Sequence, residues 1–209
     1  MQAEVKKLVD VCRRLYERGL IAGSEGNVSL RLDDGRLLTT PSGRNKGWLE
    51  PEDISCLDMA GRLVSGPKPS SEIRLHIHIY NLRSDVRAVV HTHPPYVLAV
   101  TLAGYDLRRP LLAEGALFFA DLEKAPFAVP GSDEVPAVVE PFIRRSKAII
   151  LERHGLVTLG ADLEEAFNLT DMLEHLARTH WLAYALNPGV LPLGIEELDR
   201  LRRFYPCLK

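Results

Sequence analysis

The sequence predicts an α/β protein of the α+β type, in which helices cover a largely antiparallel central sheet. Apolar residues alternate with polar ones in several segments joined by turns, and elsewhere they recur at helical spacing. No internal repeat, low-complexity stretch or linker divides the chain of 209 residues, of which 46% are hydrophobic. We therefore expect residues 1–209 to fold as one domain around a single core.

The first half of the chain is expected to combine two helices with two hairpins. In order, the sequence predicts a helix over 5–19, a hairpin of strands 27–32 and 36–40, a second hairpin over 54–64, and a helix over 73–80. Gly19 is placed to end the first helix, and Asp34-Gly35 favours a tight hairpin turn. Ser70 or Ser71 is expected to cap the start of the second helix.

The second half is expected to alternate strands with helices. The predicted elements are a strand over 86–93, a helix over 95–103, a helix that begins near 132, a strand over 148–154, a long helix over 162–186 and a short helix over 195–204. Pro94 or Pro95 can occupy the first turn of the helix that follows the first of these strands. The hairpins of the first half make the predicted sheet largely antiparallel.

The charge balance argues against several classes of partner. Lysine and arginine number 26 against 28 acidic residues, so a net charge of −2 offers no basic field for nucleic acid or an anionic membrane. We expect a small-molecule partner. Cys12, Cys56 and Cys207 lack Cys-x-x-Cys spacing, which argues against a disulfide framework and a cysteine zinc site. Without a secretion signal or a membrane-spanning apolar run, the sequence predicts a cytoplasmic protein.

The most informative motif is His91-Thr92-His93, at the end of a predicted strand. Side chains two apart on a strand point to the same face, whereas on a helix they diverge by about 200°. A third histidine, His154, ends another strand-like run and precedes Gly155, which permits a turn. Three imidazoles on strand ends are typical of a catalytic zinc site with one open position. A lone His-x-His also occurs by chance, so the pair alone leaves metal binding open.

Three short polar segments could bind an anion. Ser70 and Ser71 precede a helix whose first N–H groups are free, and the glycine-rich loops 23–29 and 39–43 can expose further N–H groups. Taken alone, each segment is better explained as an ordinary cap or turn. Their joint presence favours a phosphate site.

Two glutamates could transfer protons. Glu72, beside a trihistidine metal, could be a fourth ligand and, when substrate displaces it, a general base. Glu114 lies in an apolar stretch, where burial would raise its pKa and favour proton transfer. A solvated loop glutamate is an equally good interpretation of Glu114.

Together these motifs resemble those of the class II aldolase/adducin family. Its sugar-phosphate aldolases and epimerases share, in this order, Gly-rich-Asn-x-Ser, Thr-Pro-Ser/Thr-Gly, Pro-Ser-Ser-Glu, His-x-His and His-Gly, all present here from Gly23 to Gly155. The resemblance implies a three-layer fold and a homotetramer with sites at subunit interfaces. It implies zinc ligands His91, His93, His154 and Glu72, catalytic residues Glu72 and Glu114, and substrate- or phosphate-binding residues Asn27, Ser42, Gly43, Ser70 and Ser71.

The resemblance further implies a lyase with one Zn²⁺, or another divalent ion, per subunit. Like fuculose-phosphate aldolases, it would cleave or form a carbon–carbon bond in a ketose phosphate through a metal-stabilised enediolate. Glu114 departs from that pattern, because such an aldolase has a proton-donating tyrosine there. In this respect the chain resembles family dehydratases that act on methylthioribulose phosphate and have a glutamate in the comparable segment. Dehydration or epimerisation is therefore the alternative. An adducin-like interaction module without catalysis is a third interpretation, against which the intact histidine triad argues.

Overall fold

An eight-stranded mixed sheet forms the centre of the computed structural model, which describes residues 1–206. In chain order its strands are β1 (Asn27–Arg31), β2 (Leu37–Thr39), β3 (Ser55–Leu57), β4 (Leu63–Ser65), β5 (Ala88–Thr92), β6 (Glu123–Ala125), β7 (Ala148–Leu151) and β8 (Gly155–Gly160). Their order across the sheet is β4-β3-β2-β1-β5-β8-β7-β6, and each neighbouring pair is antiparallel except β6 with β7. The predicted largely antiparallel sheet is confirmed.

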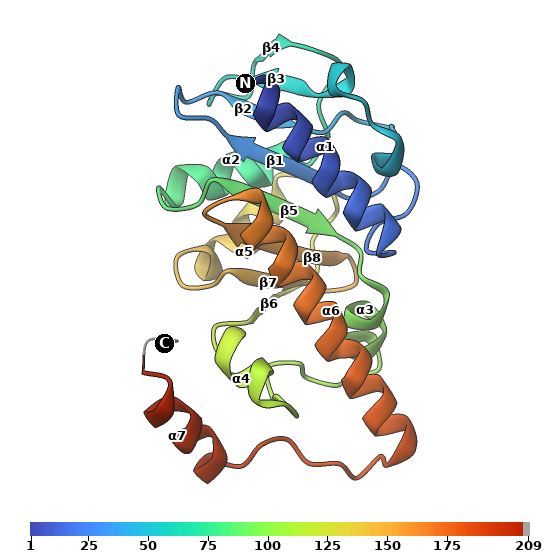
Figure 1. Cartoon of the computed structure of the whole chain (residues 1–209), viewed down its shortest axis with the longest axis vertical. Coiled ribbons are helices and arrows are strands. Elements are labelled where there is room, and N and C mark those ends of the chain that lie inside the picture. The colour runs from blue at the N-terminus through green and yellow to red at the C-terminus, as the bar shows by residue number, and fades with distance from the viewer. Residues whose placement is uncertain (207–209) are drawn as a thin grey trace.

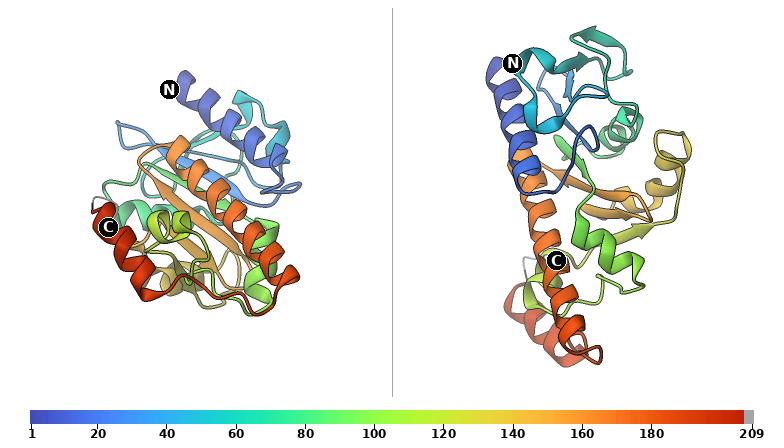
Figure 2. Two further views of the ribbon diagram at one scale, coloured as in Figure 1. Left: turned by 60° about the horizontal axis from the view of Figure 1, so that its bottom comes forward. Right: turned by 90° about the vertical axis from the view of Figure 1, so that its right-hand side faces the viewer.

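Helices cover both faces of this sheet. In chain order they are α1 (Gln2–Glu17), α2 (Ile73–Leu82), α3 (Pro95–Leu102), α4 (Ala113–Phe118), α5 (Glu134–Ile143), α6 (Leu163–Leu186) and α7 (Ile195–Phe204), with 3₁₀ turns η1 (Lys46–Trp48) and η2 (Pro51–Asp53) after β2. In Figure 1, α1 and α6 cross the sheet in front, while α2 and α5 lie behind it. The side view in Figure 2 shows the same separation. The arrangement has the three layers expected from the sequence.

The central strand β5 packs against both helical layers. Val89 belongs to the apolar cluster of α2 and α5, whereas Ala88 and Val90 belong to that of α1 and α6. Because both faces are covered, β5 forms a continuous apolar run instead of an alternating one. Its partners β1 and β8 place Asn27 and Val157 directly opposite His91. His91 thus stands near the end of a strand that is buried along its whole length.

Most predicted elements lie where the sequence places them. The helix that ends near Gly19, the two hairpins, and the helices over 162–186 and 195–204 correspond to α1, β1 to β4, α6 and α7. Asp162 caps α6 by accepting a hydrogen bond from the backbone N–H of Glu165 at 2.8 Å. Local signals for helix ends and tight turns were therefore sufficient for these elements.

The predicted cap of α2 is wrong. The N-cap position is occupied by Glu72, not by Ser70 or Ser71. The Ser70 hydroxyl accepts a weak hydrogen bond, at 3.3 Å, from the backbone N–H of Glu72, the residue just before the helix. Glu72 therefore lies at the start of the helix, and the two serines lie in the segment that precedes it.

The turn after β7 also differs from the prediction. Arg153 makes it, with a φ of 58°, whereas Gly155 is already the first residue of β8. We did not predict a strand there, because β8 is buried along its whole length, starts and ends with glycine and carries Thr158 in its centre. Such a run lacks the alternation that marks a half-exposed strand.

Cys12 and Cys56 are buried free thiols, and Cys207 lies outside the described residues. Within residues 1–206, no helix combines the length and apolar character needed to span a bilayer.

Candidate functional site

Three histidines meet where β5 ends and β7 turns into β8. His91 lies in β5, His93 follows that strand, and His154 lies in the turn. One ring nitrogen of each is within 4.8 Å of the others, and the Nε2 atoms of His91 and His93 are 3.2 Å apart. Two nitrogens bound at 2.0–2.1 Å to a tetrahedral ion would stand about 3.4 Å apart. The cluster therefore fits a divalent metal ion.

Hydrogen bonds orient two of these rings. His91 Nδ1 donates to the carbonyl oxygen of Leu156 at 3.1 Å, and His93 Nδ1 lies 2.9 Å from Glu25 Oε2. With Nδ1 engaged, each ring turns Nε2 towards the common point, as metal-binding histidines do. Glu25 is held in turn, because its Oε1 accepts a hydrogen bond from the backbone N–H of Ala22 at 2.8 Å.

Burial keeps His91 and His154 neutral. It lowers the pKa of His154 to about 4, with the charge of His93 as a smaller cause. Burial likewise holds the pKa of His91 well below its usual value, with His93, His154 and His76 as smaller causes. Metals bind the neutral form of imidazole. At neutral pH, His91 and His154 therefore present a lone pair without first releasing a proton.

Gly155 leaves room for the rings because it has no side chain. A Cβ atom at this position would lie 2.8 Å from His93 Cδ2 and 2.9 Å from His91 Cε1. From the sequence, Gly155 is expected to permit a turn. Its role is instead the close approach of β8 to the two imidazoles, which only glycine allows.

Glu72 faces the histidine cluster from the start of α2. Its Oε2 is 3.4 Å from His91 Nε2, and its Oε1 is 3.3 Å from His154 Nε2. Asn27 Nδ2 donates to Oε2 at 2.8 Å, which holds the carboxylate in place. Burial raises the pKa of Glu72, while the Asn27 hydrogen bond and the charge of His93 oppose that rise. Such a carboxylate is suited both to metal binding and to proton transfer.

The cluster opens into a cavity of about 410 Å³. The predicted site residues in its wall are Ser42, Gly43, Ser70, Ser71, Glu72, His93 and His154. A β-bridge between Pro41 and Pro69 brings two loops side by side, one with Ser42 and Gly43 and the other with Ser70 and Ser71. We call these the serine loops. Asn27 and His91 lie behind the wall, at 2% and 1% exposure. Most of the predicted metal and anion residues thus line one cavity.

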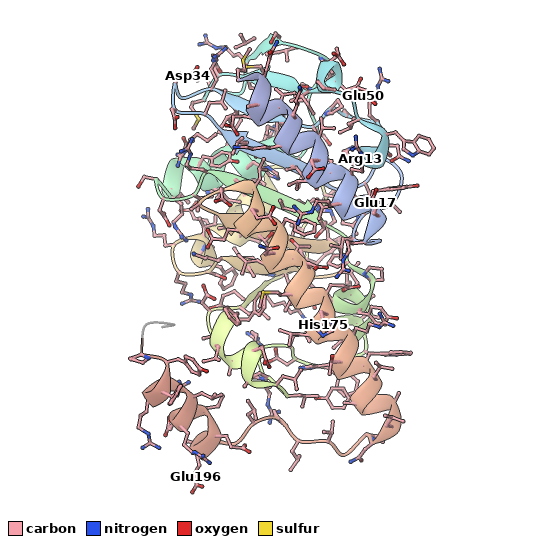
Figure 3. The ribbon with its side chains drawn as sticks, viewed as in Figure 1. Arg13, Glu17, Asp34, Glu50, His175 and Glu196 are labelled. Atoms are coloured by element: carbon pink, nitrogen blue, oxygen red, sulfur yellow. The ribbon has the colours of Figure 1, made fainter. Side chains whose placement is uncertain are left out.

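Glu114 stands apart from that cavity. It lies on α4 with its side chain exposed, so the burial on which its proton-transfer role would depend is not found in the single chain. His175, a histidine away from this cluster, is exposed on α6 (Figure 3).

Sequence reasoning missed three parts of the cavity wall, namely Glu25, Lys46 and the Pro130-Gly131 segment. Glu25 had a usable signal, because it is an acidic residue inside a loop that we assigned to anion binding. Lys46 and Pro130-Gly131 had none, since their neighbours in sequence give no indication of what lies beside them in space.

We expect Glu25→Ala to weaken divalent-metal binding by about 10- to 100-fold, because His93 loses the carboxylate that orients its ring. Glu25→Gln keeps an oxygen acceptor and should lose less. Titration with Zn²⁺ against a chelator measures the affinity. The control is Glu17→Ala, which removes an exposed glutamate of α1 that Figure 3 labels. Equal zinc affinity in the Glu25→Ala and Glu17→Ala proteins would rule out this role.

Comparison with known proteins gives one family and two kinds of named relative. The family model for the class II aldolase and adducin N-terminal domain matches residues 6–181. A 3-oxo-tetronate 4-phosphate decarboxylase of Haemophilus influenzae is 34% identical over 180 residues, which make up 84% of this chain and 86% of the relative. An L-fuculose phosphate aldolase of Methanococcus maripaludis is 36% identical over 180 residues, or 86% of this chain and 97% of the relative.

A solved structure shares the fold of nearly the whole chain. YgbL of Klebsiella pneumoniae superposes with a TM-score of 0.86 at 33% sequence identity, and the match covers 96% of this chain and 98% of that one. The similarity therefore extends over the sheet, both helical layers and the candidate site.

Proposed function

The chain belongs to the class II aldolase and adducin family, and on that premise we propose that it is a divalent-metal-dependent lyase acting on a phosphorylated sugar. The two relatives named above break a carbon–carbon bond, one by decarboxylation and one by aldol cleavage. The finer assignment that we propose is aldol cleavage of a ketose phosphate. One observation carries it: Glu72 turns both carboxylate oxygens towards His91 and His154 in a cavity bordered by serine loops.

Zn²⁺ is the ion that we propose for the site. His91, His93 and His154 would hold it through Nε2, with an oxygen of Glu72 as fourth ligand. When bound, the ion supplies Lewis acidity, which stabilises the negative charge that develops on neighbouring substrate oxygens as the carbon–carbon bond breaks.

Glu72 would move the proton. When substrate displaces Glu72 from its position beside the histidines, the Glu72 carboxylate would stay hydrogen-bonded to Asn27 Nδ2. From there it can accept or return a proton at the carbon next to the substrate carbonyl. Because burial raises its pKa, Glu72 can make both transfers nearer to neutral pH than an exposed glutamate.

The serine loops would bind the phosphate of the substrate. Ser42, Gly43, Ser70 and Ser71 line the cavity, and the start of α2 adds the partial positive charge of a helix N-terminus. Asn27, behind the wall, keeps Glu72 aligned with the bound sugar. A phosphate held on these loops leaves the reacting carbons facing the histidines, which lowers the entropic part of the barrier.

A second candidate is decarboxylation, which the Haemophilus influenzae relative favours. Loss of CO₂ from 3-oxo-tetronate 4-phosphate and loss of an aldehyde from a ketose 1-phosphate both leave dihydroxyacetone phosphate. The departing halves differ. The hydroxyl that becomes an aldehyde must lose a proton, whereas a carboxylate leaves as CO₂ without a base. Of these two reactions, only aldol cleavage needs the predicted proton-transfer role of Glu114.

We also propose that the protein is a homotetramer, as its family resemblance implies, and that it is cytoplasmic, as the sequence predicts. Glu114 is exposed on α4, so it would be free to approach the site of a neighbouring subunit. Sedimentation velocity measures the assembly directly.

One assay separates the candidate reactions. Zinc-loaded protein is incubated with pentulose phosphates, hexulose phosphates and 3-oxo-tetronate 4-phosphate, and the products are analysed by chromatography and mass. We expect a ketose phosphate to give dihydroxyacetone phosphate and an aldehyde. Decarboxylation would release CO₂, dehydration would remove only water, and epimerisation would leave the mass unchanged. Recovery of every ketose phosphate with its carbon skeleton intact would contradict aldol cleavage, and no turnover of any substrate would favour an adducin-like module.

A further inference from the structure

Lys46 is a buried lysine in the wall of the metal cavity, and the mechanism above does not use it. Its side chain is only 2% exposed. The ammonium donates hydrogen bonds to the carbonyl oxygens of Ser24, at 2.9 Å, and Arg44, at 2.8 Å. Its backbone N–H donates to the carbonyl oxygen of Gly23 at 3.1 Å. Lys46 therefore connects the glycine-rich loop to the loop that precedes η1.

Helix α1 determines where Lys46 lies. The turn η1 packs against Tyr16 at Gly47, where a Cβ atom would come within 2.9 Å of Tyr16 Cβ and closer still to its ring. Asn45 caps η1 by accepting a hydrogen bond from the backbone N–H of Gly47 at 2.9 Å. Because α1 closes the outer side of this turn, the lysine side chain lies inside, in the wall of the cavity, and not in solvent.

The chain supplies no counter-charge for this ammonium. Among residues 1–206, no carboxylate forms an ion pair with Lys46, and the two recorded acceptors are neutral backbone carbonyls. Its electrostatic neighbour is Cys12, but burial raises the pKa of that thiol to about 12, so Cys12 is uncharged at neutral pH. A buried cation without a partner is unfavourable, because it has lost its hydration.

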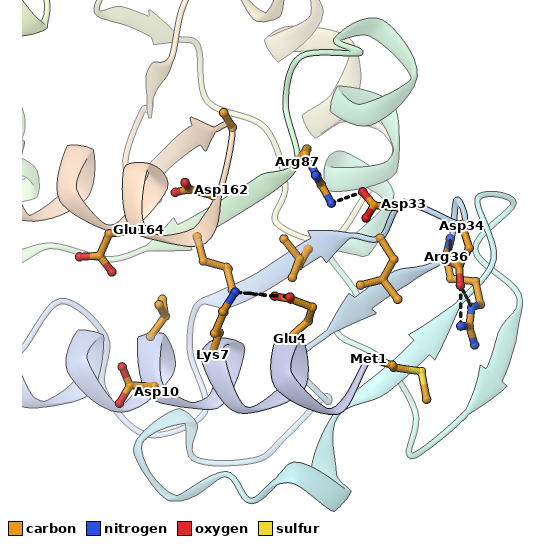
Figure 4. A pocket seen from close by; sticks show the side chains of 15 residues that line it. Met1, Glu4, Lys7, Asp10, Asp33, Asp34, Arg36, Arg87, Asp162 and Glu164 are labelled. Atoms are coloured by element: carbon orange, nitrogen blue, oxygen red, sulfur yellow. Dashed lines mark hydrogen bonds and ion pairs between the residues drawn. The ribbon is translucent and has the colours of Figure 1, made fainter.

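A second, larger hollow shows the usual arrangement. It lies between α1 and the turn that joins β1 to β2, and Figure 4 draws the charged side chains that line it. Each labelled basic side chain there is paired with a carboxylate: Lys7 with Glu4, Arg36 with Asp34, and Arg87 with Asp33. Lys46 is more deeply buried than these three side chains and, among residues 1–206, has no carboxylate partner.

We propose that the phosphate of the substrate is the missing counter-charge, and that Lys46 makes the site select phosphorylated over unphosphorylated sugars. This inference rests on the proposed function and deepens it. Lys46 lines the same cavity as Ser42, Ser70 and Ser71. An ammonium has three N–H donors, of which two go to carbonyls here, so one is free for the ligand.

The division of labour between the groups follows from their chemistry. Serine hydroxyls and backbone N–H groups orient phosphate oxygens, whereas the buried ammonium supplies a full charge that water screens poorly. An unphosphorylated sugar would leave that charge unpaired, which penalises its binding.

The test is the binding of inorganic phosphate to zinc-loaded protein, measured by isothermal titration calorimetry at pH 8. We expect Lys46→Met to raise the Kd for phosphate by about 100-fold, the range found when a buried charge pair loses one member. Lys68→Met is the matched control. The Lys68 side chain is exposed, and its carbonyl oxygen accepts a hydrogen bond from the backbone N–H of Ser42 at 3.0 Å. It should change the Kd by less than about threefold, as exposed charges do.

A second variant separates charge from loop anchoring. Lys46→Gln keeps amide N–H donors for the two carbonyls but removes the charge, so we expect it to bind phosphate as weakly as Lys46→Met. Zinc affinity and the thermal midpoint, which should stay near the wild-type values, show that the variants are folded. Phosphate binding at wild-type strength in Lys46→Gln would overturn the proposal and leave the phosphate site intact. A wild-type protein that binds no phosphate would overturn both.

Discussion

His91→Ala is expected to lose its bound metal and its enzymatic activity together. His91 is 1% exposed, and its Nε2 is 3.2 Å from His93 Nε2 and 3.4 Å from Glu72 Oε2. Alanine leaves no donor at the centre of this group. Lewis acidity is worth several kcal/mol of transition-state stabilisation, so its loss should lower kcat by at least about 10³-fold. Elemental analysis of the purified protein measures the metal, and the product assay measures turnover.

The matched control for this change is His175→Ala, which removes an exposed histidine of α6 (Figure 3). It should keep both metal and activity. Far-UV circular dichroism checks that the His91→Ala protein is folded. If that protein retained full zinc occupancy and normal turnover, the assignment of the metal centre would be wrong.

Glu72→Gln is expected to lower kcat by about 10²- to 10⁴-fold, the contribution typical of a positioned acid–base group. Glutamine keeps the shape of the side chain and an oxygen that can accept the Asn27 hydrogen bond, but it cannot carry the proton. The three histidines remain, so zinc should still bind, although more weakly. The serine loops also remain, so KM for a phosphorylated substrate should change far less than kcat.

Hydrogen exchange tests the proton transfer by Glu72 separately from carbon–carbon bond cleavage, because it needs no aldehyde. If Glu72 moves a proton at the carbon next to the carbonyl, the wild-type protein should exchange one hydrogen of dihydroxyacetone phosphate with D₂O, as followed by NMR. The Glu72→Gln protein should lose this exchange. The control Glu140→Gln changes an exposed glutamate of α5 whose Oε2 lies 3.0 Å from His78 Nε2, and it should exchange normally. Exchange at the wild-type rate in Glu72→Gln would assign the proton transfer to another group.

The sequence by itself predicted most of the elements and proposed the residues of the candidate site. A strand has a side-chain period of two, so the spacing of His91 and His93 predicts that they face the same way before any tertiary contact is known. In the structure His93 directly follows β5, and the Nε2 atoms of the two rings are 3.2 Å apart. Turn and cap signals such as Asp34-Gly35 and Asp162 act over a few residues, and the structure confirms the elements that they predict. Local geometry is encoded in local sequence, which is why these inferences succeeded.

Tertiary structure alone decided how those residues are supported. Glu25 contacts His93, Gly155 leaves room for the imidazoles, and Lys46 lies without a counter-charge in the wall of the cavity. Each of these relations joins residues that are far apart in the chain. Glu114 has an apolar neighbourhood in sequence and an exposed position in space. Burial and pairing depend on what packs from other elements. A periodic pattern can show which way a side chain points, but not what it meets there.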